Sequence, residues 1–270
     1  MLKQRVITAV VLAVLAVLLL FKSSDTIWQG VILFIAAIMA WEWAGFARLK
    51  ALWQKASFAL LVAVMVWLGV MWLPIQAILA LTLIECLLLV LVVLRYQKSK
   101  GKKGIAPPFF ILLSGALVVV LFSVALSQFR SEFSPWVILL SLLIIWAIDT
   151  GAYFSGRRFG KTKLAQYVSP GKTWEGVWGG VALAFAISVL SVFWLSIELH
   201  FSIWFFAFLL AFIALFSVLG DLFESVLKRQ VGLKDSGHIL PGHGGLLDRG
   251  DSLLIAVPMM YLLWHFGSLS

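Results

Sequence analysis

The stretch PFFILLSGALVVVLFSVAL occupies residues 108–126 and contains no charged residue. The hydrocarbon core of a bilayer is about 30 Å thick, so roughly 20 consecutive apolar residues in an α-helix cross it. A segment of this length and character therefore predicts a helix that spans a membrane.

The rest of the chain has the same character. Of its 270 residues 63% are hydrophobic and only 12% are charged, whereas a soluble domain carries about 25% charged residues. Working outward from residues 108–126, the hydropathy pattern predicts an all-α, polytopic integral membrane protein with about nine transmembrane helices. The predicted spans are Val6–Phe21, Ile27–Ala47, Ala56–Leu73, Gln76–Leu94, Pro108–Leu126, Pro135–Phe154, Val177–Leu195, Phe201–Leu227 and Leu253–Phe266.

The distribution of basic residues predicts how these spans are oriented. If the N-terminus is cytoplasmic and the spans alternate, all 21 Lys and Arg residues except Lys22 and Arg130 fall on the cytoplasmic side. Because cytoplasmic loops carry the excess of Lys and Arg, this predicts a cytoplasmic N-terminus and a C-terminus on the opposite side of a bacterial-type inner membrane. No small-residue cleavage site follows Phe21, so the first apolar stretch is expected to be a retained span, not a signal peptide.

We divide the chain into two parts. Residues 1–130 form the N-terminal membrane helices, about five spans. Residues 131–270 form the C-terminal helices, with cytoplasmic loops at 155–176 and 228–252, and these loops carry most of the residues that could do chemistry.

The basic stretch Arg95–Lys103 could suggest nucleic-acid binding on charge alone. Its position just outside a membrane span favours attraction to anionic lipid headgroups instead. A purely topogenic role, without any ligand, explains it equally well. We expect no nucleic-acid partner.

Two features of the 155–176 region and the span before it point to phosphate. Asp149 lies near the end of the sixth span, where an ionised carboxylate is costly unless a cation, a partner or water meets it. A salt bridge to a basic loop residue is the simpler alternative. The triplet Gly171-Lys172-Thr173 is not a P-loop, because Gln166 stands where the first glycine is required. What remains is a loop whose Arg and Lys side chains, Lys172 among them, and backbone N–H groups form a set of donors suited to phosphate.

The most informative segment covers residues 220–251. Four polar residues of the eighth span recur every three or four positions and therefore share one helix face. They are Asp221, Glu224, Ser225 and Lys228. Asp248 and Asp251 repeat this spacing where the last span begins, after a glycine-rich loop that permits tight turns and close approach to a ligand.

This combination predicts a metal-assisted phosphate chemistry. Carboxylates that converge from separate helices repel one another unless a cation lies between them, and hard oxygen ligands beside a phosphate-binding surface suit Mg²⁺. Acids for the metal and bases for the phosphates are what phosphoryl or nucleotidyl transfer requires. Salt bridges that merely stabilise helix ends are the alternative.

The remaining polar residues are less specific. His238 and His243 have no cysteine nearby, so a zinc site is disfavoured, and His243 could hydrogen-bond a phosphate or brace the loop. Glu42 and Glu85 lie inside predicted spans. Either could support the residues of the site from behind or line a lipid cavity, but interhelical hydrogen bonds are the simplest expectation for both.

At this segment the sequence resembles the phosphatidate cytidylyltransferases, also called CDP-diacylglycerol synthases. Their C-terminal signature is long, charged and fixed in spacing, and it is matched here at all its invariant positions. These are Ser225, Leu227, Lys228-Arg229, Lys234-Asp235, Gly237, Pro241, His243-Gly244-Gly245, Asp248-Arg249 and Asp251. The resemblance covers the C-terminal half strongly and the N-terminal half by architecture alone.

The resemblance implies transfer of CMP from CTP to phosphatidic acid, giving CDP-diacylglycerol and pyrophosphate. It implies Mg²⁺, with K⁺ as an ion that could share the site, and as partners CTP, phosphatidic acid, membrane lipids and a second copy in a homodimer. Asp221 and Asp248 resemble the family's metal ligands, and Asp149, Glu224 and Asp251 are further metal candidates. The other expected catalytic residues are Lys228, Arg229, Lys234, Asp235 and Arg249, and the expected phosphate-binding residues are Lys172, Ser225, His243, Gly244 and Gly245.

Two other functions agree less well with the sequence. The CDP-alcohol phosphotransferases also act on lipid headgroups, but their Asp-x-x-Asp-Gly cluster is absent, since Ser252 follows Asp251. A cation-binding transporter would place its acids near the midplane of broken helices, often in paired repeats. Here the acids crowd one face, and the sequence shows no repeat.

Overall fold

The computed structural model describes residues 2–105, 107–240, 242 and 244–269, with side chains from Ile7 onward. In these residues the chain is helical apart from its connections and one small β-hairpin. The helices are α1 (Leu2–Lys22), α2 (Asp25–Phe46), α3 (Leu52–Trp72), α4 (Ile75–Lys98), α5 (Pro108–Glu132), α6 (Pro135–Phe159), α7 (Trp174–Leu195), α8 (Ile203–Gln230) and α9 (Leu247–Gly267). The hairpin pairs β1 (Lys163–Ala165) with β2 (Ser169–Thr173) in antiparallel register.

Seven of the described helices, α2 to α8, are long and apolar enough to cross a membrane, so the protein is a multi-pass membrane protein. Helix α1 contributes a shorter apolar stretch, Ile7–Lys22. Helix α9 is not among the seven. Its first turn carries Asp248 and Arg249, and Asp251 follows directly after that turn.

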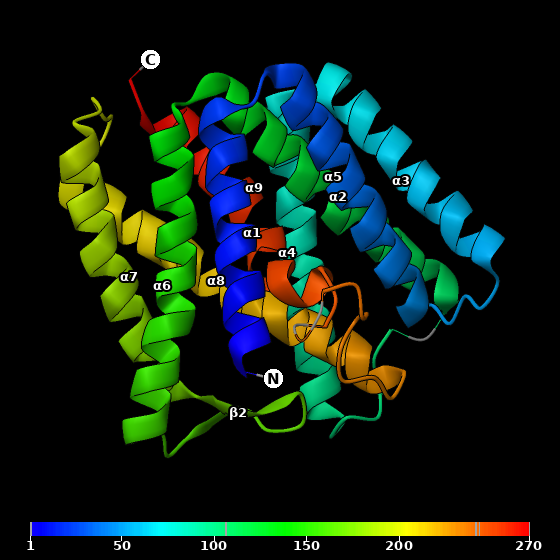
Figure 1. Ribbon diagram of the computed structural model, residues 1–270. Helices are drawn as coiled ribbons and strands as arrows, with labels where there is room; N and C mark the ends of the chain where they lie inside the picture. Colours follow the sequence, from blue (N-terminus) through cyan, green and yellow to red (C-terminus); the bar gives the residue numbers. More distant parts are fainter. Residues whose placement is uncertain (1, 106, 241, 243, 270) are drawn as a thin grey trace.

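The helices run alternately up and down, so the connections gather at two opposite ends (Figure 1). The lower end in this view holds the α2–α3 and α4–α5 connections, the β-hairpin and the loop before α9. The upper end holds the remaining connections and the end of α9, where Leu269 N–H donates to the carbonyl of Glu198, 2.8 Å away. The segments with most of the basic residues therefore share one end.

Helix α5 is the centre of the packing. Of the 18-residue apolar stretch of α5, 67% is buried inside the protein, against 22% of the corresponding stretch of α3. Helix α5 is therefore surrounded mainly by other helices, whereas α3 lies at the surface of the bundle. The indole Nε1 of Trp43 donates to the carbonyl of Ile111, 2.9 Å away, and its ring leaves no room for a side chain at Gly115. This close approach joins α2 to α5.

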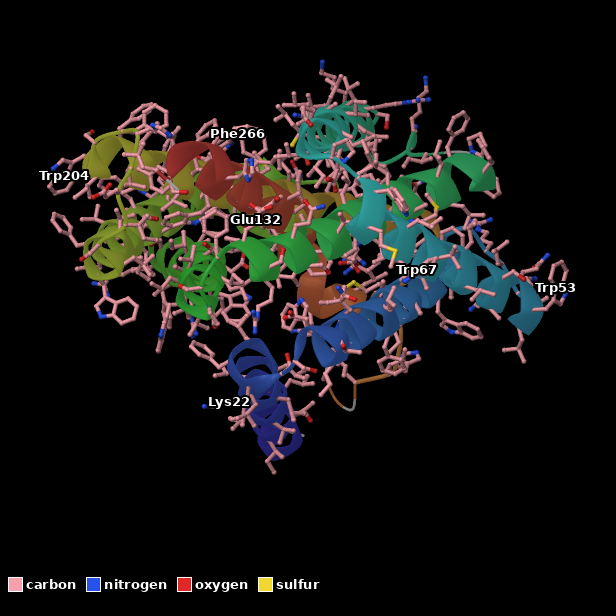
Figure 2. All side chains as sticks on the ribbon, turned by 90° about the horizontal axis from the view of Figure 1, so that it is seen from above. Lys22, Trp53, Trp67, Glu132, Trp204 and Phe266 are labelled. Carbon is pink, nitrogen blue, oxygen red and sulfur yellow. The ribbon has the colours of Figure 1, made fainter. Side chains whose placement is uncertain are left out.

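The outer surface is apolar over large areas. Figure 2 shows Trp53 and Trp204 at opposite outer edges of the bundle. The side chains of Trp53 and Trp204 are 70% and 61% exposed. A surface of this kind is stable in lipid, where exposed aromatic and aliphatic groups cost nothing.

The two predicted cytoplasmic loops are shorter than expected. Helix α6 continues to Phe159 and α7 begins at Trp174, so the hairpin fills most of the predicted loop 155–176. The hairpin is also an exception to the all-α prediction. Likewise α8 continues to Gln230 and α9 begins at Leu247, inside the predicted loop 228–252. Basic residues are favourable in the last turn of a helix, which explains why α6 and α8 extend past their apolar stretches.

Candidate functional site

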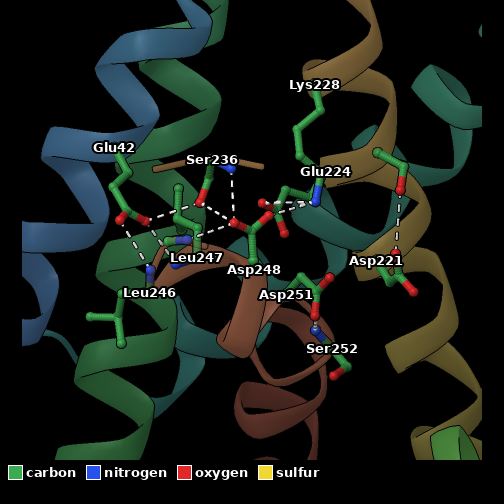
Figure 3. A network of polar contacts seen from close by, with 12 residues as sticks. Glu42, Asp221, Glu224, Lys228, Ser236, Leu246, Leu247, Asp248, Asp251 and Ser252 are labelled. Carbon is green, nitrogen blue, oxygen red and sulfur yellow. Dashed lines mark hydrogen bonds and ion pairs between the residues drawn. The ribbon is translucent and has the colours of Figure 1, made fainter. Parts of the chain in front are cut away.

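The site lies where α8 and α9 meet the end of α2, at the lower end of the bundle (Figures 1 and 3). Carboxylates from three helices converge there around one lysine and one loop serine. The carboxylates are those of Glu42, Asp221, Glu224, Asp248 and Asp251.

Lys228 of α8 is the central cation. Its Nζ lies 2.8 Å from Oδ1 of Asp248 in α9 and 3.4 Å from Oε1 of Glu224, one turn earlier on α8. All three side chains are largely buried, at 12%, 5% and 1% exposed. Glu224 accepts no hydrogen bond within the described residues, so Lys228 at 3.4 Å is the partner that compensates its charge.

The second oxygen of Asp248 is held by the loop. Oδ2 accepts from the backbone N–H of Ser236 and of Gly245, both at 2.8 Å, and lies 3.0 Å from the Ser236 hydroxyl. Asp248 precedes the apolar stretch that begins at Leu253. Burial alone would raise the pKa of Asp248, but the hydrogen bonds from Lys228, Gly245 and Ser236 outweigh it and lower the pKa. The carboxylate is therefore kept ionised and in a fixed orientation.

The N-terminus of α9 is capped by a residue of another helix, Glu42 of α2. Its Oε1 accepts from the N–H of Leu246, the N-cap residue of α9, at 3.0 Å, and its Oε2 accepts from the N–H of Leu247, the first residue of that helix, at 2.9 Å. The first N–H groups of a helix have no intrahelical partner, and the N-terminus favours negative charge. Leu246 has no side chain that could cap the helix, so Glu42 supplies what the local sequence lacks.

Glycines allow the loop to pack directly onto these carboxylates. Gly244 has a φ of +83°, and a Cβ there would lie 2.7 Å from Oδ2 of Asp248. A Cβ at Gly245 would collide with the Ser236 hydroxyl and with Glu42. The glycines allow a close approach to the protein's own acids, and their predicted approach to a ligand stays a prediction.

The β-hairpin joins the site through Lys172. Its Nζ lies 2.5 Å from Oδ2 of Asp221, whose Oδ1 lies 3.3 Å from the Ser225 hydroxyl. Glu175 fixes the start of the hairpin by accepting from the N–H of Lys161 and Thr162, each at 3.1 Å. Lys172 is thus brought from a distant loop to the α8 face that carries Asp221.

Negative charge exceeds positive charge in this region. Asp149 of α6 lies close enough to Lys172 and Asp221 for their charges to act on it, and the charge of Asp221 also acts on Asp251. The ion pairs that the structure describes here involve two lysines, Lys172 and Lys228. Apart from Glu42, which accepts from N–H groups at the start of α9, five carboxylates therefore share two cations. They are those of Asp149, Asp221, Glu224, Asp248 and Asp251.

This donor set fits Mg²⁺. Both oxygens of Glu224 are buried without a hydrogen-bond donor, and the carboxylates outnumber the lysines paired with them, so a divalent cation would lower their mutual repulsion. No three His, Cys, Asp or Glu side chains of the described residues are placed to hold one ion by themselves. Mg²⁺ does not require such a cage, since it usually takes one or two carboxylates together with water and substrate phosphates.

Several predicted residues are not part of this network. Arg229, Lys234 and Arg249 are exposed, and the structure describes no ion pair for them. Asp235 is exposed as well and lies against Gly244, where a Cβ would be 3.2 Å from the Asp235 Cβ. Two positions of the signature, Pro241 and His243, lie outside the described residues.

Sequence reasoning missed Ser236 and did not identify the partners of Glu42. The prediction of an interhelical hydrogen bond for Glu42 is confirmed, but its partners in the site were not foreseen. The sequence feature that marks Glu42 is an isolated acidic residue within an apolar span. Glu85 carries the same signal, yet it is fully buried with neither carboxylate oxygen hydrogen-bonded within the described chain, so the hydrogen bond predicted for it is wrong.

Comparison with known proteins gives a consistent result. A sequence model of the "Cytidylyltransferase family" matches residues 3–266. A protein of Pseudomonas aeruginosa named phosphatidate cytidylyltransferase is 39% identical, over 99% of this chain and 98% of its own. Proteins of the same name from Haemophilus influenzae and Helicobacter pylori are 36% and 38% identical, each over 98% of this chain and over 99% and 92% of their own lengths.

Proposed function

This chain belongs to the cytidylyltransferase family, and from that premise we propose that it is a phosphatidate cytidylyltransferase. The reaction joins the phosphate of phosphatidic acid to the CMP part of CTP, and the products are CDP-diacylglycerol and pyrophosphate. The observation that carries the proposal is the pairing of Lys172 with Asp221 and of Lys228 with Asp248 at one end of a membrane bundle.

The chemistry needs an attacking oxygen and a leaving group, both already charged. An oxygen of the phosphatidate phosphate attacks the α-phosphorus of CTP, and the bond from that phosphorus to the pyrophosphate oxygen breaks. Because a phosphate monoester is largely ionised near neutral pH, the step needs no strong general base. The protein's contribution is to orient the two phosphates and to stabilise their charge.

Two lysines would carry out that task. Lys172 pairs with Asp221 and Lys228 with Asp248, and in this proposal each turns toward a phosphate oxygen while remaining near its carboxylate. Ser225 and the backbone N–H of Gly244 would supply neutral donors. The N–H of Gly245, which donates to Asp248 here, would have to leave that carboxylate to join them. The exposed Arg229, Lys234 and Arg249 would meet the nucleotide phosphates from the cytosolic side, and His243 belongs with the phosphate-binding residues of the signature.

Mg²⁺ would be held by Asp221 and Asp248, with Asp149, Glu224 and Asp251 as further ligands and K⁺ as an ion that could share the site. When bound, it would neutralise the charge that develops on the phosphates during transfer.

We further propose that all nine helices cross a bacterial inner membrane, with the N-terminus and the site on the cytoplasmic side and the C-terminus opposite. The lower end in Figure 1, which gathers the basic segments, would then be cytoplasmic. This arrangement suits the two substrates, because phosphatidic acid is dissolved in the bilayer and CTP in the cytosol. A site at the boundary reaches both.

The decisive experiment is an assay of the purified chain with CTP, phosphatidic acid and Mg²⁺. We expect release of pyrophosphate together with CDP-diacylglycerol, and comparison with dCTP, ATP and UTP defines the nucleotide range. Asp221→Asn and Asp248→Asn are each expected to lower turnover at least about a hundredfold, a loss typical for removing a key electrostatic group.

Asp25→Asn is the matched control, because Asp25 is an exposed aspartate in the first turn of α2, at the opposite end of the bundle. It should turn over like the unmodified protein. Full activity in both site variants would overturn the assignment of the metal ligands, and absence of turnover with CTP in the unmodified protein would overturn the proposed reaction.

A further inference from the structure

A second charged feature lies outside the site just described. A groove of about 640 Å³ runs along the cytoplasmic-side end of α4 and the segment after it. Its lining combines two leucines with four basic side chains and has no acidic residue. These residues are Leu91, Leu94, Arg95, Lys98, Lys102 and Lys103.

The apolar half of the groove continues along α4. Leu83, Leu87, Leu91 and Leu94 recur every three or four residues, so they form one stripe on the helix. All four are exposed, and Leu91 is still 57% and Leu94 48% exposed where the stripe enters the groove. A hydrocarbon chain lying against this stripe would therefore lead directly to the basic half.

The basic half is held in shape by the backbone. Lys100 adopts a left-handed conformation with a φ of 54°, and the N–H groups of Lys100 and Gly101 donate to the carbonyls of Gln97 and Tyr96 at 3.1 and 3.0 Å. This is the pattern of a Schellman helix end. The chain then turns back, because the N–H of Lys103 donates to the Ser99 hydroxyl, 2.8 Å away.

The segment is also anchored beyond this turn. The side-chain amide of Gln230, at the end of α8, accepts from the N–H of Ile105 at 3.2 Å and donates to its carbonyl at 2.8 Å. Basic residues that serve only as topogenic signals need no such fixed backbone, since their side chains can extend freely into water. The fixed backbone beside this groove therefore favours a binding role for its basic side chains.

We propose that this groove binds one anionic glycerophospholipid, with its phosphate among the basic side chains and an acyl chain along the leucine stripe. Charge complementarity selects a phosphate-bearing headgroup, and the adjoining apolar stripe selects a lipid over a free anion. The groove shares no lining residue with the carboxylate site. Gln97, next to it, accepts from the N–H of Tyr167 in the hairpin turn at 3.1 Å, so the lipid would sit beside the element that carries Lys172.

The test uses the full chain in phosphatidylcholine nanodiscs with a minor fraction of phosphatidylglycerol, an anionic lipid without a phosphate monoester. Native mass spectrometry counts the phosphatidylglycerol molecules that stay bound. The double variant Lys98→Gln/Lys102→Gln should lower retention of one lipid at least about tenfold, given the contribution of each basic residue near an anionic lipid. The matched control is Lys50→Gln/Lys100→Gln, two exposed lysines of the same end that do not line the groove.

Equal retention by the groove variant and the unmodified chain would overturn the proposal, as would an equal loss in the control, which would indicate diffuse surface charge. Displacement of the lipid by inorganic phosphate would also overturn it, because it would identify a free-anion site. Circular dichroism should show the same helical content in all three proteins, since the four lysines are exposed. Because the experiment measures lipid binding and not turnover, its result does not depend on the outcome of the CTP assay.

Discussion

Glu42 and Asp248 share one hydroxyl group. The Oγ of Ser236 lies 3.1 Å from Oε2 of Glu42 and 3.0 Å from Oδ2 of Asp248, so a residue of α2 and one of α9 are joined through the loop between α8 and α9 (Figure 3). A hydroxyl has one proton, so it donates to one of the two carboxylates at a time. The position of Asp248 consequently depends on a glutamate far away in the sequence.

Glu42→Gln should therefore impair both stability and activity. The amide keeps only one acceptor oxygen, so one of the N–H groups of Leu246 and Leu247 loses its partner, which costs about 1–3 kcal/mol. Because Asp248 is oriented by the same loop, we expect CTP turnover to fall roughly 10- to 100-fold, as when the supporting partner of a metal ligand is removed. Thermal unfolding in detergent and the pyrophosphate assay measure the two effects. Unchanged values in both would contradict the role of Glu42.

Glu85→Gln is the natural contrast. Glu85 is also a buried glutamate in a span, but its carboxylate has no hydrogen-bond partner within the described residues. An unpaired charge in such a place is unfavourable, so a neutral amide of the same shape removes no stabilising contact. We expect the free energy of unfolding to change by less than about 0.5 kcal/mol, or to rise. A large loss of stability would show instead that this carboxylate holds a ligand.

Lys228→Met should destabilise the protein by about 3–5 kcal/mol, because it leaves Glu224 and Asp248 buried without their cation. Adding Glu224→Gln to this variant removes one of the two uncompensated charges. We expect the double variant to recover part of the stability but none of the turnover, since the cation that orients phosphate is still missing. If Lys228→Met unfolds at the same temperature as the unmodified chain, the ion pairs do not stabilise the site.

Mg²⁺ should stabilise the folded chain in the absence of substrate. A ligand that binds only the folded state adds about 2.7 kcal/mol at a hundred times its dissociation constant. We expect the unfolding temperature to rise when Mg²⁺ is added after treatment with EDTA, and this rise to be absent in Asp221→Asn. Ca²⁺-free buffer containing only K⁺ provides the comparison for a monovalent ion. An identical rise in Asp221→Asn would place the metal elsewhere.

Much of the fold could be predicted because it is written in local patterns. An uncharged stretch such as residues 108–126 has to be helical in lipid, where every backbone N–H and C=O must find its partner within the segment. The shared face of Asp221, Glu224 and Lys228 likewise follows from helical periodicity and from nothing else. The ends of the helices were less predictable. The hydropathy pattern predicted that the sixth span ends at Phe154, whereas α6 continues to Phe159.

The uncharged stretch at residues 108–126 and the charged segment at 220–251 were sufficient, by themselves, to determine a membrane-spanning helical protein with its acids, bases and glycines at one end. Only the tertiary structure decided that Glu42 caps α9, that Lys172 reaches Asp221 from a hairpin, and that the central lysine is Lys228. Hydropathy and helical spacing act between neighbours in sequence. Ion pairs and caps form between residues that only the packing of separate helices brings within hydrogen-bonding distance.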